Sequence, residues 1–462
     1  MQIAEIDLGK YSNRFSSYTE LRLHENRSQS IVLLNGDVVS NARDTTGGVS
    51  ARVFNGGTWG FSSNPDMSND AIDGTISAAT RNADFLARRC GNEDAALPLS
   101  NASADSDFST KKMLKTQEEK IAFLTEIDNY IVSSFPDVVS RQVLLSCLDM
   151  EKKLQTSEGS NGHNVTTRSL IAVKLTTENE NKEPVELSEA IGARGQYEDV
   201  FESMDTIIPA LDKLYAQLLD KKEAVQPISG YHDVILASDL AGILAHEAIG
   251  HTTEADIVRA GSVAADYLNK KVASDLITLV DFANTYEGET LPVPIYLDDE
   301  GVESLDAVII EDGVLKSYMH NKDSAQHFGM PLTGNARAFS YTDEPLVRMR
   351  NTAILSGSSS LDEMIASIDE GYLLMRPTNG QADSTSEFMF GVQMGYEIKN
   401  GKLGKAISDT TISGVAFDML NNVSMVSDEM VWSCAGMCGK KQPMPVGMGG
   451  PAVKTKVCIG GQ

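Results

Sequence analysis

The chain has 462 residues, of which 41% are hydrophobic, so it is long enough to bury a large core and to form two or three domains. It carries 39 Lys and Arg residues against 65 Asp and Glu residues, and the resulting formal charge of −26 disfavours a nucleic-acid-binding function. The five cysteines are odd in number and widely scattered, which argues against a disulfide framework and predicts reduced thiols.

The sequence shows no sign of a membrane segment or a secretory leader. No run of about 18 apolar residues occurs, and residues 1–7 are too polar to be a leader. We therefore expect a cytoplasmic protein without a membrane partner.

The first half of the chain alternates predicted strands with predicted helices. A helix is predicted at 69–89, where apolar side chains recur on one face. A second helix begins at a capping box, in which Thr116 precedes Glu119 by three residues. Alternating patterns predict strands at 20–24, 30–34, 49–53, 143–148, 165–176 and 185–192.

An amphipathic helix predicted at 204–224 closes this half. The segment Gln-Pro-Ile-Ser-Gly at 226–230 follows it and is typical of a linker. We therefore predict two domains, residues 1–225 and residues 226–462.

The second half is predicted to be rich in strands. A strand at 234–237 leads into a helix for which Ser238 or Asp239 is the expected N-cap. Short strands separated by turns favour antiparallel pairing over a doubly wound parallel sheet. The predicted fold class is α+β, with an N-terminal α/β-type layer of antiparallel strands plus helices and a strand-dominated antiparallel C-terminal domain that carries the helix after residue 237. Its further strands are expected at 276–282, 293–297, 307–310, 313–319, 349–354 and 388–398.

That helix contains two imidazoles and a carboxylate within six residues. His246, Glu247 and His251 are the side chains of a hydrolytic zinc site. The H-E-x-x-H motif of metalloproteases separates its histidines by four residues, whereas a separation of five turns the rings about 140° apart on an ideal helix. The helix must therefore end or carry a π-bulge near Gly250 if both rings bind one ion, and glycine makes either deviation inexpensive.

The residues alone leave the third metal ligand open. Cys434 and Cys438 form a C-x-x-x-C pair in a loop rich in Gly and Pro, where a thiolate can be presented to a metal. Glu254 and Asp256 follow the second histidine closely, and zinc also accepts carboxylate oxygen. Three protein ligands leave a fourth position for a zinc-activated water, and Glu247 would act on it as general base and then as general acid.

The order of motifs along the chain resembles that of the TldD/PmbA family, whose members have been called modulators of DNA gyrase. The resemblance covers nearly the whole chain, and the H-E-x-x-x-H helix and the C-terminal Cys-Gly-Lys are features of the TldD branch that the PmbA branch lacks. The matching segments are GVSARV at 48–53, WGF at 59–61, HEAIGH at 246–251, LDDEG at 297–301, GVLKSYM at 313–319, TGNAR at 333–337, RMRNT at 348–352, CGK at 438–440 and PVG at 445–447.

This resemblance implies a two-domain α+β metallopeptidase that uses zinc to hydrolyse unfolded or extended polypeptide. It implies His246, His251 and Cys438 as the metal ligands and Glu247 as the general base or acid. It also implies a dimer, either a homodimer or a heterodimer completed by a PmbA-like subunit.

Two other functions are compatible with the same residues. A noncatalytic assembly or regulatory subunit would hold a structural zinc with four protein ligands, for which Cys434, Cys438, His246 and His251 are available. An enzyme that removes the leader from a ribosomal peptide would perform the same hydrolysis on a narrower substrate.

For a peptidase, a strand-rich domain can bind an extended peptide by adding it to a sheet edge.

The remaining polar clusters are interpreted as structural. His320 and His327 are expected to have a core or surface role rather than to bind metal. The acidic run at 298–300 lacks the alternating ligands of a calcium loop and is predicted to be a solvated turn between two strands. The turn at 334–337 is expected either to bind substrate backbone or to be purely structural.

Overall fold

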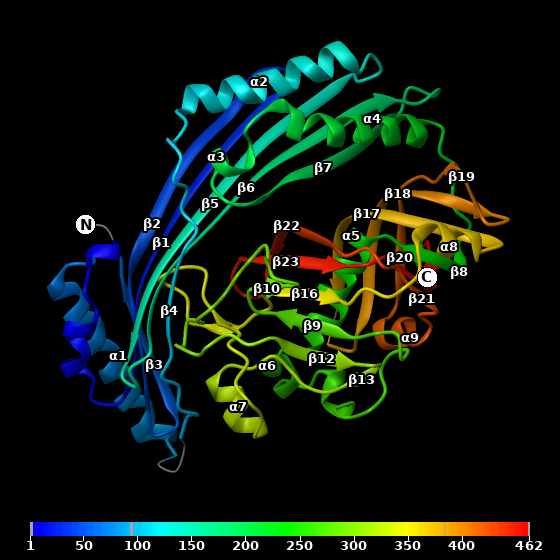
Figure 1. Cartoon of the computed structure of the whole chain (residues 1–462). Helices are drawn as coiled ribbons and strands as arrows, with labels where there is room; N and C mark the ends of the chain where they lie inside the picture. Colours follow the sequence, from blue (N-terminus) through cyan, green and yellow to red (C-terminus); the bar gives the residue numbers. More distant parts are fainter. Residues whose placement is uncertain (1–2, 93–95, 383, 461–462) are drawn as a thin grey trace.

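In the computed structural model, which describes residues 3–92, 96–382 and 384–460, a long curved sheet arches over a second group of strands (Figure 1). The curved sheet has the strand order β3-β2-β1-β5-β6-β4, and β7 pairs with β6 as well. The segments predicted as two strands at 20–24 and 30–34 form one strand, which pairs with β2 on one side and β5 on the other. The strands are β1 (Tyr18–Leu34), β2 (Asp37–Asn55), β3 (Thr58–Asn64), β4 (Ser103–Asp107), β5 (Ser140–Thr156), β6 (Asn161–Glu178) and β7 (Pro184–Arg194).

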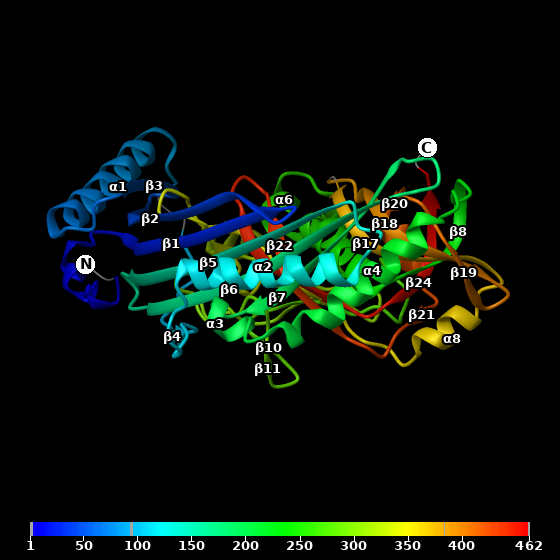
Figure 2. The same cartoon turned by 90° about the horizontal axis from the view of Figure 1, so that it is seen from above.

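Three long helices cover this sheet. Helix α1 (Asn69–Cys90) confirms the helix predicted at 69–89 and packs against β2 and β3. Helix α2 (Gln117–Ser134) begins at the predicted capping box, and α4 (Ile208–Lys222) lies within the predicted 204–224. Figure 2 shows α2 and α4 over the same face of the sheet, where their apolar side chains share one core. The shorter helices of this half are η1 (Ile3–Glu5), η2 (Gly9–Arg14), α3 (Tyr197–Val200) and η3 (Met204–Thr206).

The second half of the chain forms two larger sheets with helix α5 (Ser238–Leu244) between them. A six-stranded sheet has the order β13-β12-β9-β16-β23-β22, and a seven-stranded sheet has the order β17-β8-β24-β20-β18-β19 with β21 paired to β24. Helix α5 contacts β23 and β16 of the first sheet and β17 and β8 of the second. This position buries Leu240, Ala241 and Leu244 completely.

Most strands of this half are short, as the sequence predicted, whereas β17 and β18 have 13 residues each. They are β8 (Gly230–Leu236), β9 (Leu279–Phe282), β10 (Thr285–Tyr286), β11 (Glu289–Thr290), β12 (Ala307–Glu311), β13 (Val314–Leu315), β14 (Ala336–Arg337), β15 (Leu346–Val347), β16 (Asn351–Ile354), β17 (Glu370–Ala382), β18 (Glu387–Lys399), β19 (Lys402–Ala406), β20 (Thr410–Val415), β21 (Met425–Val426), β22 (Val431–Cys438), β23 (Met444–Gly450) and β24 (Val453–Ile459). The helices after residue 254 are α6 (Ala255–Arg259), η6 (Val263–Asp266), α7 (Lys322–Phe328), α8 (Leu361–Ala366) and α9 (Ala416–Asn421).

The predicted α+β fold class with mainly antiparallel strands is confirmed. Among the described strands, the parallel pairs are β4 with β6, β8 with β17 and β16 with β23. No helix in the described part of the chain is both long and apolar enough to cross a membrane.

Several local predictions in the second half are wrong, and the strand predicted at 313–319 is limited to β13, residues 314–315. The segment 293–297 is not a strand, because the side-chain amide of Asn351 hydrogen-bonds both the N–H and the carbonyl of Val293 in place of a neighbouring strand. Helix α5 has no side-chain N-cap. Instead, Asp239 accepts hydrogen bonds from the backbone N–H groups of Leu240 and Arg376, at 2.8 and 2.9 Å.

The acidic run at 298–300 lies buried between the curved sheet and the second half, so the prediction of a solvated turn is also wrong. Lys152 of β5 donates to Asp299 Oδ2 at 2.6 Å, and Arg52 of β2 pairs with Glu300. Buried charges require partners of opposite sign. These ion pairs therefore join the two halves of the molecule.

The predicted division at residues 225 and 226 stays a prediction. The core under helix α4 includes Met394 of β18 and Ala406 of β19 beside the side chains of the curved sheet. The two halves thus share apolar contacts as well as ion pairs.

A buried ion pair anchors the six-stranded sheet. Asp281 of β9 and Arg350, which precedes β16, are both fully buried, with Nε and Oδ2 2.9 Å apart. Asp281 also accepts hydrogen bonds from the Thr352 hydroxyl and the Asn335 amide. The buried carboxylate of Asp281 therefore has both a counter-charge and hydrogen-bond donors inside the protein.

Replacing Asp281 with Asn is expected to destabilise the fold by about 3 to 5 kcal/mol, because it leaves the Arg350 guanidinium buried without a counter-charge. Denaturant unfolding followed by circular dichroism measures the change. The matched control is Asp275→Asn, which removes an exposed partner of Lys271 and is expected to cost at most about 1 kcal/mol. Equal stability of D281N and wild type would contradict this account.

Candidate metal centre

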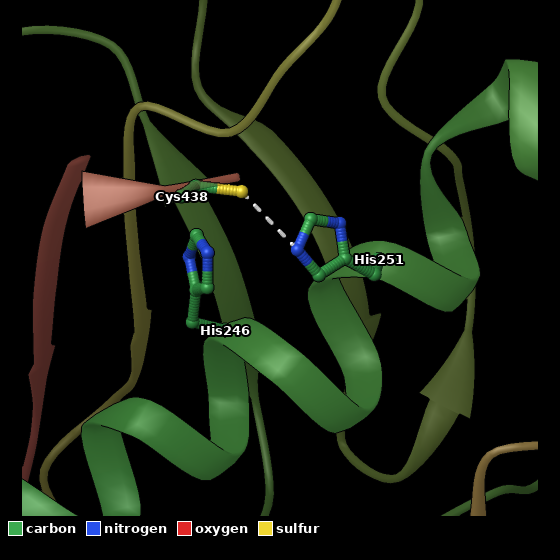
Figure 3. A group of neighbouring side chains, drawn as sticks. All are labelled: His246, His251 and Cys438. Carbon is green, nitrogen blue, oxygen red and sulfur yellow. Dashed lines mark hydrogen bonds between the residues drawn. The ribbon is translucent and has the colours of Figure 1, made fainter. Parts of the chain in front are cut away.

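Helix α5 continues without interruption into a π-helical turn, η4 (Ala245–Gly250), and a final 3-10 turn, η5 (His251–Thr253). The backbone N–H of His251 donates to the carbonyl of His246, five residues earlier. Residues joined by such an i→i+5 bond lie one above the other on the helix. The predicted departure from α-helical geometry near Gly250 is therefore confirmed, and it turns both imidazoles to one side (Figure 3).

Gly250 serves this turn by its small size rather than by its conformational freedom. Its φ of −56° is one that any residue adopts. A Cβ atom at this position would lie 2.0 Å from the Sδ atom of Met349, a side chain that is itself buried. The expected reason for the glycine is therefore corrected: packing against Met349 requires it.

The third side chain comes from the end of β22. Cys438 Sγ lies 3.2 Å from His251 Nε2, and the rings of His246 and His251 have their centroids 5.2 Å apart (Figure 3). The donor atoms of His246, His251 and Cys438 all lie within 4.8 Å of one another. The fold thus brings together three of the predicted site residues from positions almost two hundred residues apart in the chain.

A buried arginine holds the loop that follows Cys438. The Arg348 guanidinium donates to the carbonyls of Cys438, Lys440 and Gln442 at 3.1, 2.8 and 2.8 Å. Arg337, from the turn predicted at 334–337, donates to the carbonyl of Pro445 at 2.9 Å on the same hairpin. The turn therefore has a structural role in this part of the site.

His246 indicates that the group is built for a metal ion. Its side chain is 1% exposed, and among the described residues neither ring nitrogen has a hydrogen-bond partner. A buried polar group without a partner costs about 1 to 3 kcal/mol, so such groups are rare unless a ligand satisfies them. Two imidazoles and a thiolate are a donor set typical of zinc. The residues therefore fit that ion.

The position of the Cys438 thiol beside two imidazoles changes its pKa. Burial alone would raise its pKa, but the imidazoles of His246 and His251 outweigh this effect and lower the pKa to about 4. For His251, burial lowers the pKa, while Glu254 and Cys438 raise it to about 10. A metal ligand must be the thiolate, which these surroundings favour, whereas the protonated imidazole of His251 must lose a proton before its Nε2 atom can bind a metal.

Glu247 lies at the accessible side of the group. Its Oε2 atom is 3.7 Å from His251 Nε2, and its side chain is a quarter exposed to solvent. The carboxylate therefore faces the same ring nitrogen as the thiol and can be reached by water.

The other candidate ligands lie elsewhere. Glu254 contacts the opposite nitrogen of His251, with Oε2 2.7 Å from Nδ1, and Asp256 pairs with Lys440. Cys434 is buried four residues before Cys438, beyond a bulge in β22, and burial raises the pKa of its thiol. None of these three belongs to the group of donor atoms found among the described residues.

Lys440 and the role of Glu254 behind His251 were not identified from the sequence. The available signal was spacing: Glu254 follows His251 by three residues, and Lys440 follows Cys438 by two. Lys440 Nζ lies 3.2 Å from Glu254 Oε2. Spacing alone does not show that these two segments meet.

His320 and His327, for which the sequence predicted a core or surface role, lie outside the group of donor atoms found among the described residues. His320 is fully buried beside Phe328, its Nδ1 lies 3.1 Å from the Ser324 hydroxyl, and burial lowers its pKa to about 4. His327 is exposed in the last turn of α7.

Similarity to known proteins extends over most of the chain. Residues 229–461 match the PmbA/TldA metallopeptidase C-terminal domain, and residues 19–83 match PmbA/TldA metallopeptidase domain 1. A zinc metalloprotease TldD homologue from Saccharolobus solfataricus is 31% identical over 411 residues, 88% of this chain and 88% of its own. A metalloprotease from Methanocaldococcus jannaschii is 32% identical over 444 residues, 95% of this chain and 96% of its own. The crystal structure of TldE from Thermococcus kodakarensis has a similar fold, with a TM-score of 0.75, 16% identity and 98% of each chain covered.

Proposed function

The chain belongs to the PmbA/TldA metallopeptidase family, and from that premise we propose that His246, His251 and Cys438 hold a catalytic zinc ion. The observation that carries this proposal is the buried imidazole of His246, which has no partner among the described residues and faces the thiol of Cys438. The name of the Saccharolobus solfataricus relative, a zinc metalloprotease, supports the choice of zinc. A zinc ion, when bound, polarises a scissile carbonyl and lowers the pKa of water toward about 7.

Glu247 is the proposed proton carrier. Its carboxylate lies beside His251 Nε2 and is a quarter exposed to solvent, so water can reach it. A carboxylate in this place can accept a proton from the attacking water and donate it to the amine nitrogen of the leaving group. The position directly after His246 on a buried helix keeps the carboxylate close to the ligands.

The number of grouped side chains favours a catalytic over a structural site. Structural zinc sites usually have four protein ligands, whereas catalytic sites have three and an open position. Among the described residues the group has three members, and Cys434 is not one of them. This supports hydrolysis over the alternative of a noncatalytic subunit.

Replacing Cys438 with Ser is expected to lower bound zinc well below about one ion per chain, because the thiolate supplies one of three ligands. Metal analysis of protein that has been stripped, reloaded and desalted measures this. Cys434→Ser is the matched control and is expected to keep its zinc. Undiminished zinc in C438S would remove Cys438 from the ligand set.

Replacing Glu247 with Gln is expected to lower the rate of peptide hydrolysis about 100- to 10,000-fold while leaving bound zinc and thermal unfolding unchanged, because only the proton carrier is lost. Cleavage assays with an unstructured peptide measure the rate. A wild-type rate in E247Q would show that Glu247 carries no proton. Wild-type protein that binds zinc and cleaves no peptide at all would favour the noncatalytic subunit.

We propose an extended polypeptide as the substrate because an outer strand ends at the site. Strand β22, whose last residue is Cys438, pairs only with β23 among the described strands. The carbonyls of Cys434 and Gly436 accept hydrogen bonds from Arg168 of β6, at 3.1 and 2.8 Å. A peptide backbone that paired with these two carbonyls would therefore have to displace the Arg168 guanidinium.

A cavity of about 460 Å³ lies beside the same strand. It is lined by the end of β7, by the β10–β11 hairpin and by Trp432 of β22. Tyr286 and Trp432 give it aromatic walls, while Glu287, Glu289 and Arg194 give it charged groups of both signs. The two carboxylates outnumber the single guanidinium, which supports binding of neutral or basic side chains rather than acidic ones.

A denatured protein is expected to be cleaved and its folded form to be resistant, because only an unfolded chain can extend along β22. Gel electrophoresis of one model protein, with and without an intact disulfide that keeps it folded, measures the difference. Equal cleavage of the two forms would contradict strand addition.

The finer points of the function stay predictions. They include the TldD-branch assembly as a homodimer or as a heterodimer with a PmbA-like subunit, and a cytoplasmic location. An enzyme dedicated to the leader of one ribosomal peptide would use the same residues with a narrower substrate.

A further inference from the structure

A buried charge cluster closes the side of His251 that faces away from Cys438. Glu254 is completely buried, and its Oε2 atom accepts a hydrogen bond from His251 Nδ1 at 2.7 Å. Lys440 Nζ lies 3.2 Å from the same oxygen and donates to Asp256 Oδ1 at 2.7 Å. One carboxylate oxygen thus contacts both the imidazole and the ammonium group.

The ammonium group comes from the loop that carries the thiol. Lys440 follows Cys438 by two residues, and its Nζ also donates to the carbonyl of Val347 at 2.9 Å. The contact between Lys440 and Glu254 therefore links the end of the histidine helix to the end of β22. These two segments are brought together only in the folded protein.

The arrangement has a defined effect on the His251 ring. When a carboxylate accepts the Nδ1 proton, the ring is held in one orientation and Nε2 is left free toward the ion. Nε2 is the atom that faces Cys438 Sγ. A fully buried carboxylate is costly unless it is paired, and here the pairing cation is Lys440.

We propose that Glu254 and Lys440 form one positioning unit for the metal ligands: Glu254 orients His251, and Lys440 holds Glu254 and the Cys438 loop at a fixed separation. The proposal rests on the proposed role of His251 and Cys438 as zinc ligands. Neither residue belongs to the group of donor atoms formed by His246, His251 and Cys438, so both are proposed as positioning residues.

The first test is the zinc affinity of the full-length protein, measured by competition with a chromophoric chelator. Glu254→Gln and Lys440→Met are each expected to weaken zinc binding about 10- to 100-fold, the usual effect of losing a partner of a ligand. Lys441→Met is the matched control, because Lys441 is exposed next to Lys440, and it is expected to bind zinc as the wild type does. Wild-type affinity in both E254Q and K440M would overturn the proposal.

A double-mutant cycle tests whether the two residues act as one unit. The combined variant E254Q/K440M is expected to lose less affinity than the product of the two single losses, because the second substitution breaks a contact that is already lost. Losses that multiply would show two independent residues and overturn the single unit.

Conservative variants distinguish positioning from simple folding. Lys440→Arg keeps the charge and is expected to restore part of the affinity lost in K440M, while Glu254→Asp withdraws the carboxylate from Nδ1 and is expected to fall between wild type and E254Q. The visible spectrum of the cobalt-substituted protein reports ligand geometry without any activity assay, and a changed spectrum is expected in E254D and K440M. Variants that unfold more easily but keep wild-type spectra and affinity would assign the pair to folding alone and overturn the proposal.

The test separates this inference from the proposed function. If the wild type binds no zinc, or if His246→Ala binds it as tightly as the wild type, the metal site itself fails. If zinc binding depends on His246 and Cys438 but not on Glu254 and Lys440, only the positioning unit fails.

Discussion

The hydrogen bond from the His251 N–H to the His246 carbonyl is the contact on which the site depends. It spans five residues rather than four, and so places two imidazoles above each other that an α-helix would turn apart. The turn is held on both sides: α5 lies between two sheets, and Met349 occupies the space where a side chain at Gly250 would be. A metal site with this spacing therefore requires a helix enclosed by protein.

Buried charges fix the elements that surround the turn. Arg348 holds the loop after Cys438 through three carbonyls, and Arg350 pairs with Asp281 in the sheet below. Asp299 and Glu300 connect the same half to the curved sheet. Apolar packing alone tolerates small shifts, whereas paired buried charges lose much free energy when they separate. These ion pairs and hydrogen bonds, several of them distant from the site, therefore fix the positions of the elements that carry its side chains.

Local patterns in the sequence predicted much of the fold. Helix α1 was predicted within one residue at each end, and the start of α2 was predicted at the Thr116 capping box, because apolar spacing and caps are local signals. The strand at 293–297 was predicted wrongly, because the Asn351 side chain, far along the chain, takes the place of a neighbouring strand there. Strand β1 was predicted as two strands because its middle is polar. It is one continuous strand because β2 and β5 pair with it on both sides.

The residues alone predicted the chemistry: two histidines and a glutamate with a spacing that demands a non-α turn, and a set of thiols and carboxylates that offer a third ligand. The folded chain brings the thiol of Cys438 to the two imidazoles, whereas Cys434, Glu254 and Asp256 lie outside the group of donor atoms found among the described residues. Cys438 and His251 are 187 residues apart, and their contact depends on how β22 packs beside α5. The same packing turned Glu254 to the far nitrogen of His251 and placed Lys440 against it. Spacing along a chain predicts which residues share one helix face, but contacts between distant segments depend on the packing of the whole domain.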